Sequence, residues 1–248
     1  MKKLHFILAN LLFLPLHLSA QEVYFQLEKL PEFINSEYAE ITPVPSRDGN
    51  TLYFTRVAYP EFSKYLFLDS VDLHKKYPPE KYDRLLQTIY TELSGKPVRD
   101  PVSSPFNQDI WIAEGDSAIF YLLTHPDAPL NNALPNSIVA ITPDPNAFSC
   151  INQYSEKGDM SKGFSLIRRA DSLWTYPTPV EIEEYYTITS DVNLTMSFDG
   201  QVLILSAVRH DSRDMDLYVC FNTGENKWSA PQHLGNIVNS VKRETTPF

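Results

Sequence analysis

The sequence of 248 residues predicts an all-β fold made of β-propeller blades, with one helix inserted in the first blade. Three observations lead to this prediction: a repeat of about 53 to 55 residues, a tight turn followed by an apolar run in each copy, and a composition rich in Pro, Tyr and Phe. A repeat period of this length is typical of propellers and solenoids. Proline and aromatic residues with few glycines suit short strands joined by defined turns.

Each copy of the repeat opens with a polar doublet, which precedes a Ser or Thr that begins a tight turn. An Asp-Gly pair between two apolar runs predicts a hairpin, because both central residues of a type I′ turn need positive φ. A strand-like apolar run follows every turn. The doublets are Asn35-Ser36, Asn131-Asn132, Tyr186-Thr187 and Asn239-Ser240; the turns are Ser46-Arg47-Asp48-Gly49, Thr142-Pro143-Asp144-Pro145 and Ser197-Phe198-Asp199-Gly200; the runs begin at Thr51, Ala147 and Val202.

Two later markers recur in the same order. A second strand opens on an aspartate, at Asp109 and at Asp216, and a tryptophan follows further along, at Trp174 and at Trp228. The second copy lacks this aspartate and the glycine of the turn, and a run that begins at Gly163 takes the place of its second strand. The agreement of independent markers predicts a structural repeat.

The first copy carries an insertion between two strands of its blade. Gly49 and Asp109 lie 60 positions apart, whereas Gly200 and Asp216 lie 16 apart, and the surplus of 44 covers roughly residues 57–106. Apolar residues of the insertion follow i, i+3, i+4, i+7 spacing, which predicts an amphipathic helix that starts at Pro78-Pro79 and ends at Gly95. We favour a structural role, in which the apolar stripe covers a blade edge or seals the first blade, over a functional one.

The predicted organisation follows from these markers. Propellers close with about four to eight blades, so three blades and part of a fourth leave an open arc. We expect the chain to be part of a longer protein with missing C-terminal blades, and closure by self-association is the alternative. The segments are a signal peptide over 1–20 and a propeller region over 21–248, with blade 1 over 35–130, its insertion over 57–106, blade 2 over 131–185, blade 3 over 186–238 and the start of blade 4 over 239–248.

The first twenty residues have the layout of a secretory signal peptide. Two lysines precede an apolar run from Phe6 to Leu18, and Ser19-Ala20 stands before a polar segment. The run is shorter than a membrane span requires, and proline and histidine interrupt it. Because no later segment is apolar enough to cross a bilayer, we expect no transmembrane span in the mature chain and localisation to the periplasm or the outer membrane.

Charge and cysteine content narrow the partners. A formal net charge of -10 without a basic tract argues against nucleic acid, which needs a phosphate-neutralising surface. The only two cysteines, Cys150 and Cys220, fall at different points of two repeats. Buried free thiols are therefore the favoured interpretation, with a disulfide as the alternative.

The turn, the Asp-Ile/Leu-Trp/Tyr strand and the W-[ST]-x-P segment with its following L-G and N-S pairs resemble WD40-like propeller repeats of the TolB type. The stretches 197–221 and 228–248 are similar to the propeller region of OmpA-family envelope proteins of Gram-negative bacteria. The resemblance covers nearly all of the predicted mature chain. It implies a periplasmic or outer-membrane-associated interaction platform, with envelope or secretion-assembly proteins as partners.

The sequence offers little support for catalysis. Glycoside hydrolysis needs two carboxylates around the sugar bond, and the richest cluster is Asp211, Asp214 and Asp216. The last of these already has a structural explanation as the aspartate that opens a strand. No serine-nucleophile motif occurs, and the histidines His74, His125, His210 and His233 lack metal-site spacing, so we interpret each as a surface or loop residue.

We therefore predict no catalytic, cofactor-binding or metal-binding residues and a non-catalytic role in protein or cell-envelope contacts. A carbohydrate-binding or glycoside-active propeller is the alternative. Recurrence in register favours packing between blades for the three tryptophans. A further polar register lines the propeller channel or caps turns, and its members are Glu40, Asn136, Asp191 and Glu244.

Overall fold

The computed structural model describes residues 27–117, 119–154, 160–171, 173–189 and 191–247. The predicted signal peptide over 1–20 lies outside these residues. Internal contacts divide the chain into Met1–Leu30 and Pro31–Phe248, and all assigned strands and helices belong to the second part. The described residues form a mostly β fold with two helices, which confirms the all-β class in its coarse form.

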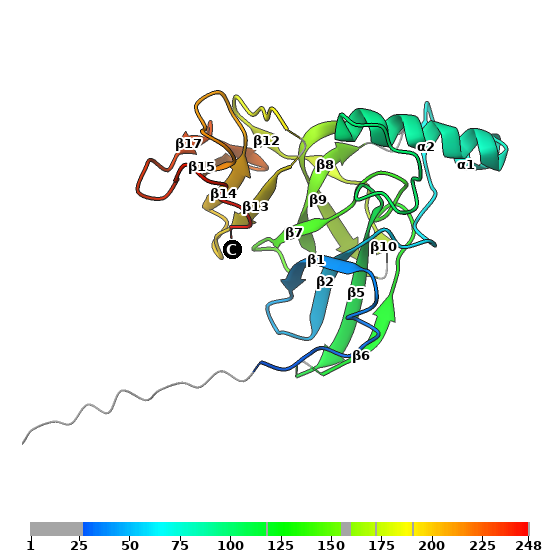
Figure 1. The fold of residues 1–248 in the computed structure, drawn as a ribbon. Helices are drawn as coiled ribbons and strands as arrows, with labels where there is room; N and C mark the ends of the chain where they lie inside the picture. The colour runs from blue at the N-terminus through cyan, green and yellow to red at the C-terminus, as the bar shows by residue number, and fades with distance from the viewer. Residues whose placement is uncertain (1–26, 118, 155–159, 172, 190, 248) are drawn as a thin grey trace, which may run out of the picture. The chain divides into compact units, whose positions relative to one another are not determined.

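Three antiparallel sheets follow one another along the second part (Figure 1). Sheet 1 has the order β1-β2-β5-β6, and neighbouring strands are antiparallel. Its bounds are β1 (Ala39–Pro45), β2 (Thr51–Val57), β5 (Gln108–Asp116) and β6 (Ile119–Thr124).

Sheets 2 and 3 have the same antiparallel order of three main strands. The short strand β12, which follows the last strand of sheet 2 in the sequence, pairs in parallel with β16 and so belongs to sheet 3. Sheet 2 comprises β7 (Ile138–Ile141), β8 (Ala147–Tyr154), β9 (Met160–Ala170), β10 (Leu173–Trp174) and β11 (Thr178–Pro179). Sheet 3 comprises β12 (Glu181–Ile182), β13 (Asn193–Met196), β14 (Val202–Ala207), β15 (Asp216–Gly224), β16 (Lys227–Trp228) and β17 (Gln232–His233).

The first strands of the three sheets, β1, β7 and β13, lie side by side (Figure 1). Each precedes one of the tight turns that the sequence predicts, and the apolar runs after the turns form β2, β8 and β14. The repeat markers did not include the first strands themselves, and β1 and β13 are only partly buried.

The turns differ from the predicted type I′ geometry. Only the glycine has positive φ, 74° at Gly49 and 68° at Gly200, while the preceding Asp48 and Asp199 do not. The glycine N–H donates to the carbonyl of the first turn residue, and the aspartate side chain accepts hydrogen bonds from the turn. The loops are therefore longer turns that end on a left-handed glycine.

The two turn glycines provide a matched pair. A Cβ at Gly49 meets nothing within 4 Å, whereas a Cβ at Gly200 lies 2.5 Å from Cγ of Pro143 in the turn of sheet 2. We expect Gly49→Ala to cost about 1 kcal/mol through its positive φ alone. Gly200→Ala should cost about 2 to 3 kcal/mol because the clash adds to the strain. Urea unfolding of both variants measures this, and equal losses would contradict the close approach of the turns.

Side chains that alternate along the central strands bury both faces of sheet 2. Phe148, Cys150 and Ile167 pack with Tyr53 and residues of β5 in sheet 1. The intervening residues pack with sheet 3; they include Ala147, Phe164 and Leu166. Period-two alternation of this kind lets one strand contribute to two separate cores.

The tryptophans lie at or between these interfaces. Trp228 is buried in the core between sheets 2 and 3, and Trp174 of β10 contacts Tyr53 of sheet 1 and Phe148 of sheet 2. Trp111 instead stacks on His125 at 4.4 Å between ring centroids. Packing between sheets therefore holds for two of the three tryptophans.

The insertion contains the predicted helix, α2 (Pro79–Ser94), which ends at Gly95 with φ 67°. A short α1 (Leu73–Lys76) and a hairpin of β3 (Phe67–Leu68) and β4 (Val71–Asp72) precede it. The hydroxyl of Tyr90 donates to the carbonyl of Ala133, just before β7. The apolar stripe of α2 packs on the insertion and on the connection to sheet 2; its buried members are Tyr82, Leu86 and Tyr90.

Both cysteines are free and buried, as the favoured interpretation expects. Cys150 lies in the core between sheets 1 and 2, and Cys220 in the core between sheets 2 and 3. Burial raises the pKa of the Cys220 thiol to about 12 and raises that of Cys150 as well.

Because only the thiolate is a good nucleophile, we expect both cysteines to resist alkylation in the folded protein. Iodoacetamide at pH 8 should label neither residue in the native state and both after unfolding in guanidinium, as read by intact mass. Rapid native labelling of either residue would contradict the packing of its core.

Candidate functional site

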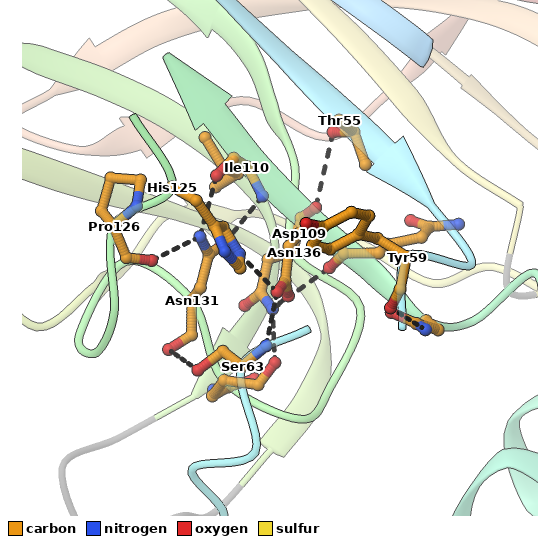
Figure 2. Close-up of polar contacts among 12 residues, drawn as sticks. Thr55, Tyr59, Ser63, Asp109, Ile110, His125, Pro126, Asn131 and Asn136 are labelled. Atoms are coloured by element: carbon orange, nitrogen blue, oxygen red, sulfur yellow. Dashed lines mark hydrogen bonds and ion pairs between the residues drawn. The ribbon is translucent and has the colours of Figure 1, made fainter. Parts of the chain in front are cut away.

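An Asp-His-Asn network connects sheet 1 to the chain that leads into sheet 2 (Figure 2). One carboxylate oxygen of Asp109, at the start of β5, lies 2.8 Å from Nε2 of His125 and accepts the backbone N–H of Ser63. Asn131 accepts the backbone N–H of Ile110 and donates to the carbonyl of the same residue, each at 2.8 Å. A single asparagine side chain thus satisfies both backbone groups of a buried strand residue.

The same arrangement recurs in sheet 3. Asp216 starts β15 and lies 2.9 Å from Nε2 of His233. It also accepts the backbone N–H of Arg213. Asn239 accepts the N–H of Leu217 at 2.8 Å and donates to its carbonyl at 2.9 Å.

Sheet 2 lacks all three members of this network. In sheet 1, Thr124 pairs with Ile112 of the third strand, and His125 follows it directly. In sheet 3, Gln232 pairs with Val219, and His233 follows it directly. The matching position in sheet 2 is Pro179, after Thr178. Glycine and tyrosine stand where the aspartate and asparagine would be, at Gly163 and Tyr186. Joint loss indicates that the three side chains act together.

The chemistry of the network is that of a structural tie. Burial raises the pKa of the Asp109 carboxyl, and the hydrogen bonds from His125 and from the Ser63 N–H oppose this shift. In sheet 3, Nδ1 of His233 accepts the N–H of Gly235, so both ring nitrogens have partners. A histidine in this state has no nitrogen available to take a proton from a nucleophile.

The interpretation of the histidines as surface or loop residues fits three of them: His74 and His210 are exposed, and His125 lies in the loop after β6. His233 lies instead in β17. His125 and His233 are partly buried, and each contacts an aspartate. A signal existed in the sequence: the histidine follows its aspartate by 16 positions in one copy and 17 in the other. The two aspartates were correctly interpreted as structural residues at strand starts.

Substitution of Asn131 or Asn239 tests how much these side chains contribute to the free energy of unfolding. Asn131→Ala leaves the N–H and carbonyl of Ile110 buried without their side-chain partner, so we expect a loss of about 2 to 3 kcal/mol in the free energy of unfolding. Asn239→Ala should lose a similar amount through Leu217. Asn146→Ala, at an exposed turn residue, is the control and should stay within about 0.5 kcal/mol. Denaturant unfolding measures all three, and a change below 1 kcal/mol for Asn131→Ala would contradict the tie.

A cavity of about 260 Å³ lies where the first strands of the three sheets approach one another. Its polar wall includes Asn152 of sheet 2 and Asp191, which pairs with Arg243 at 3.1 Å at the rim. Ser206 also lines it, and its buried Oγ has no hydrogen-bond partner among the described residues.

An adjoining apolar hollow of about 520 Å³ shares part of this wall. The two spaces have Thr42, Val139, Asn193 and Thr246 in common. Thr42 and Thr246 both have positive φ, 51° and 53°, which is rare for a β-branched residue. Together the two hollows, from here on the central cavity, join a polar end to an apolar end.

The four residues of the predicted polar register do not all have the same role: some cap turns, and one lines a cavity. Glu40 and Glu244 cap turns, because they accept the hydroxyls of Ser36 and Ser240 at 2.6 Å. Asn136 is buried and donates to nearby carbonyls. Asp191 alone of the four lines the central cavity.

The acidic cluster of Asp211, Asp214 and Asp216 has local structural contacts. Asp211 accepts the hydroxyl of Tyr218 at 3.0 Å, and Asp214 accepts the N–H of Met215, so each takes part in local structure. Among the described residues no group of three or more His, Cys, Asp or Glu is placed to hold a metal ion. Within the same residues, no helix has the length and apolar character of a membrane span.

Comparison with known proteins adds no relative. No family model matches the chain, and no curated protein matches it.

Proposed function

We propose that the chain is a non-catalytic, exported module of the propeller type, which acts through contacts with envelope or secretion-assembly proteins. The observation that carries the proposal is the recurrence of one structural plan in successive sheets. Each sheet has an antiparallel order of three main strands, and its first strand lies next to the first strand of the preceding sheet. Adjacent first strands are the arrangement expected around a propeller axis.

The recurrence extends to the connections between sheets. The N–H of Asn136 donates to the carbonyl of Gln108, and the N–H of Glu244 donates to the carbonyl of Met215, both at 2.8 Å. In each case the chain leaves one sheet and enters the next first-strand position at the same point. This supports blade boundaries near residues 131 and 239.

Binding is favoured over catalysis by the use of the titratable groups. Both Asp-His pairs take part in internal hydrogen bonds, and Asp211 and Asp214 do so as well. The central cavity instead combines an apolar end with a polar rim at Asp191 and Arg243. A mixed lining of this kind suits a peptide segment of a partner protein.

Export and envelope contact rest on the leader-like residues 1–20 and on the resemblance to TolB-type and OmpA-family propeller regions. In this proposal, the signal peptide is removed after Ala20 and the remaining chain works in the periplasm or at the outer membrane. The formal net charge of -10 argues against nucleic acid as its partner.

Site-specific photo-crosslinking in a Gram-negative host tests the proposal. A photoreactive residue in place of Asp191, whose side chain is 66% exposed at the cavity rim, should give an adduct of defined mass with an envelope protein. The matched control is the same residue in place of Tyr121, which is 71% exposed on the outer strand β6 and should give no adduct. Mass spectrometry of the periplasmic fraction should find a chain that begins at Gln21.

Two results would contradict the proposal. One is a chain that keeps residues 1–20 and stays in the cytoplasm. The other is turnover of a glycan panel that Asp211→Asn or Asp214→Asn abolishes, because this would establish the glycoside-active alternative.

A further inference from the structure

Among the described residues, no further sheet packs on one face of sheet 3, although most of the matching positions in sheets 1 and 2 are buried. Strand pairing places Val202 opposite Phe221 and Ile204 opposite Val219, with Leu217 next along β15. We call these five residues the trailing face of sheet 3. Phe221 is 45% exposed and the other four are partly exposed.

The opposite face of the same strands is fully used. Leu203 pairs with Cys220 and Leu205 with Tyr218, and all four side chains are buried in the core against sheet 2. We call this face, which contacts the preceding sheet, the leading face of sheet 3. The half-burial of the trailing face is therefore a property of one side of the sheet.

In sheets 1 and 2 the residues that match Ile204, Leu217 and Val219 are buried, whereas Phe221 matches the partly exposed Glu114 and the exposed Arg168. Tyr53, Ile110 and Ile112 of sheet 1 are less than 5% exposed and pack on sheet 2. In sheet 2, Phe164 and Leu166 occupy the positions of Leu217 and Val219 and pack on sheet 3. The trailing face of sheet 3 thus continues two established interfaces in register.

A polar detail points to the same kind of neighbour. Thr55 in sheet 1 donates its hydroxyl to Oγ of Ser137, at the entry to the first strand of sheet 2, at 2.8 Å. Ser206 stands at the position of Thr55 in sheet 3, is fully buried, and has no partner for Oγ among the described residues. Thr245 stands at the position of Ser137, and both Ser206 and Thr245 line the central cavity.

A second copy of the chain offers no free leading face to pair with the trailing face of sheet 3. The leading face of sheet 1 is sealed: the guanidinium of Arg56 lies 4.3 Å from the ring centroid of Trp111 and donates to the carbonyls of Phe33 and Ile34. Its ion pair with Glu40 at 2.9 Å holds the charge in place. The leading faces of sheets 2 and 3 are already buried.

We propose that the trailing face of sheet 3 is the docking surface for a partner protein, which covers it with the apolar face of a twisted antiparallel β-sheet next to residues Glu244–Pro247. This rests on the proposed function and names the kind of partner for it. The complementary face has large apolar side chains at alternate positions of two neighbouring strands, as Phe148 and Ile167 have towards sheet 1.

A graft of the chain's own second sheet is the probe. Glu244 matches Asn136 in register, so a copy of residues 141–185 fused after Phe248 presents the face of Phe148 and Ile167 to the trailing face of sheet 3. We expect the fusion to raise Tm by about 5 °C or more over the unfused chain, because it buries Ile204, Leu217 and Val219. Differential scanning calorimetry measures the shift.

Val219→Lys supplies the matched control. Because Val219 is partly exposed in the unfused chain, the substitution alone should change Tm by less than about 2 °C. In the fusion it should abolish the gain, since a charge would be buried in the new interface. An unchanged Tm in the fusion, or a gain that persists with Val219→Lys, would overturn the proposal.

The mass of the unfused chain in solution shows whether a second copy of the chain, and not a partner protein, covers the trailing face of sheet 3. We expect a monomer by light scattering, and a dimer that Val219→Lys dissociates would overturn the proposal in favour of a second copy. These measurements use purified protein and do not depend on export or on the cross-linking partner. Failure of the docking surface and failure of the proposed function therefore give separate results.

Discussion

The succession of sheets depends on the hydrogen bonds that Asn131 and Asn239 make to the backbone of the third strand. Each asparagine binds both polar groups of one residue, Ile110 or Leu217, at the point where the chain leaves a sheet. The Asp-His pair beside it fixes the start of the same strand and the segment before it. With the exit of the chain fixed there, the next first strand begins at a defined place.

The apolar cores can form only if this placement is accurate. A shift of one residue in a strand exchanges its two faces, so Phe148 and Ala147 would trade the cores they enter. Sheet 2 tolerates the absence of the polar tie because it is buried on both sides, by Tyr53 and Ile110 of sheet 1 and by Leu203 of sheet 3. Within the part of the chain that the structure describes, another sheet packs on only one side of sheet 3, and sheet 3 keeps the full network.

The elements with strong local signals could be predicted from the sequence. The glycines of the turns, the apolar runs of β2, β8 and β14, and the helix that ends at Gly95 all depend on residues close in sequence. The first strands could not, because short segments of mixed polarity such as β13 become strands through pairing with the next strand and through neighbours far along the chain. The polar network escaped for the same reason: spacing alone does not show that His125 turns back onto Asp109. The hydrogen bonds of Arg56 that cover the leading face of sheet 1 could not be predicted either. The sequence of a strand does not show which backbone carbonyls an arginine in it will bind.

Residue-resolved hydrogen exchange tests the central role of the asparagine ties most directly. If they fix the succession of sheets, the amides of Ile110 and Leu217 exchange only with global unfolding, and Asn131→Ala accelerates exchange at Ile110 while Leu217 stays protected. Rapid exchange of both amides in the unmodified protein, at the rate of exposed turns, would contradict the account.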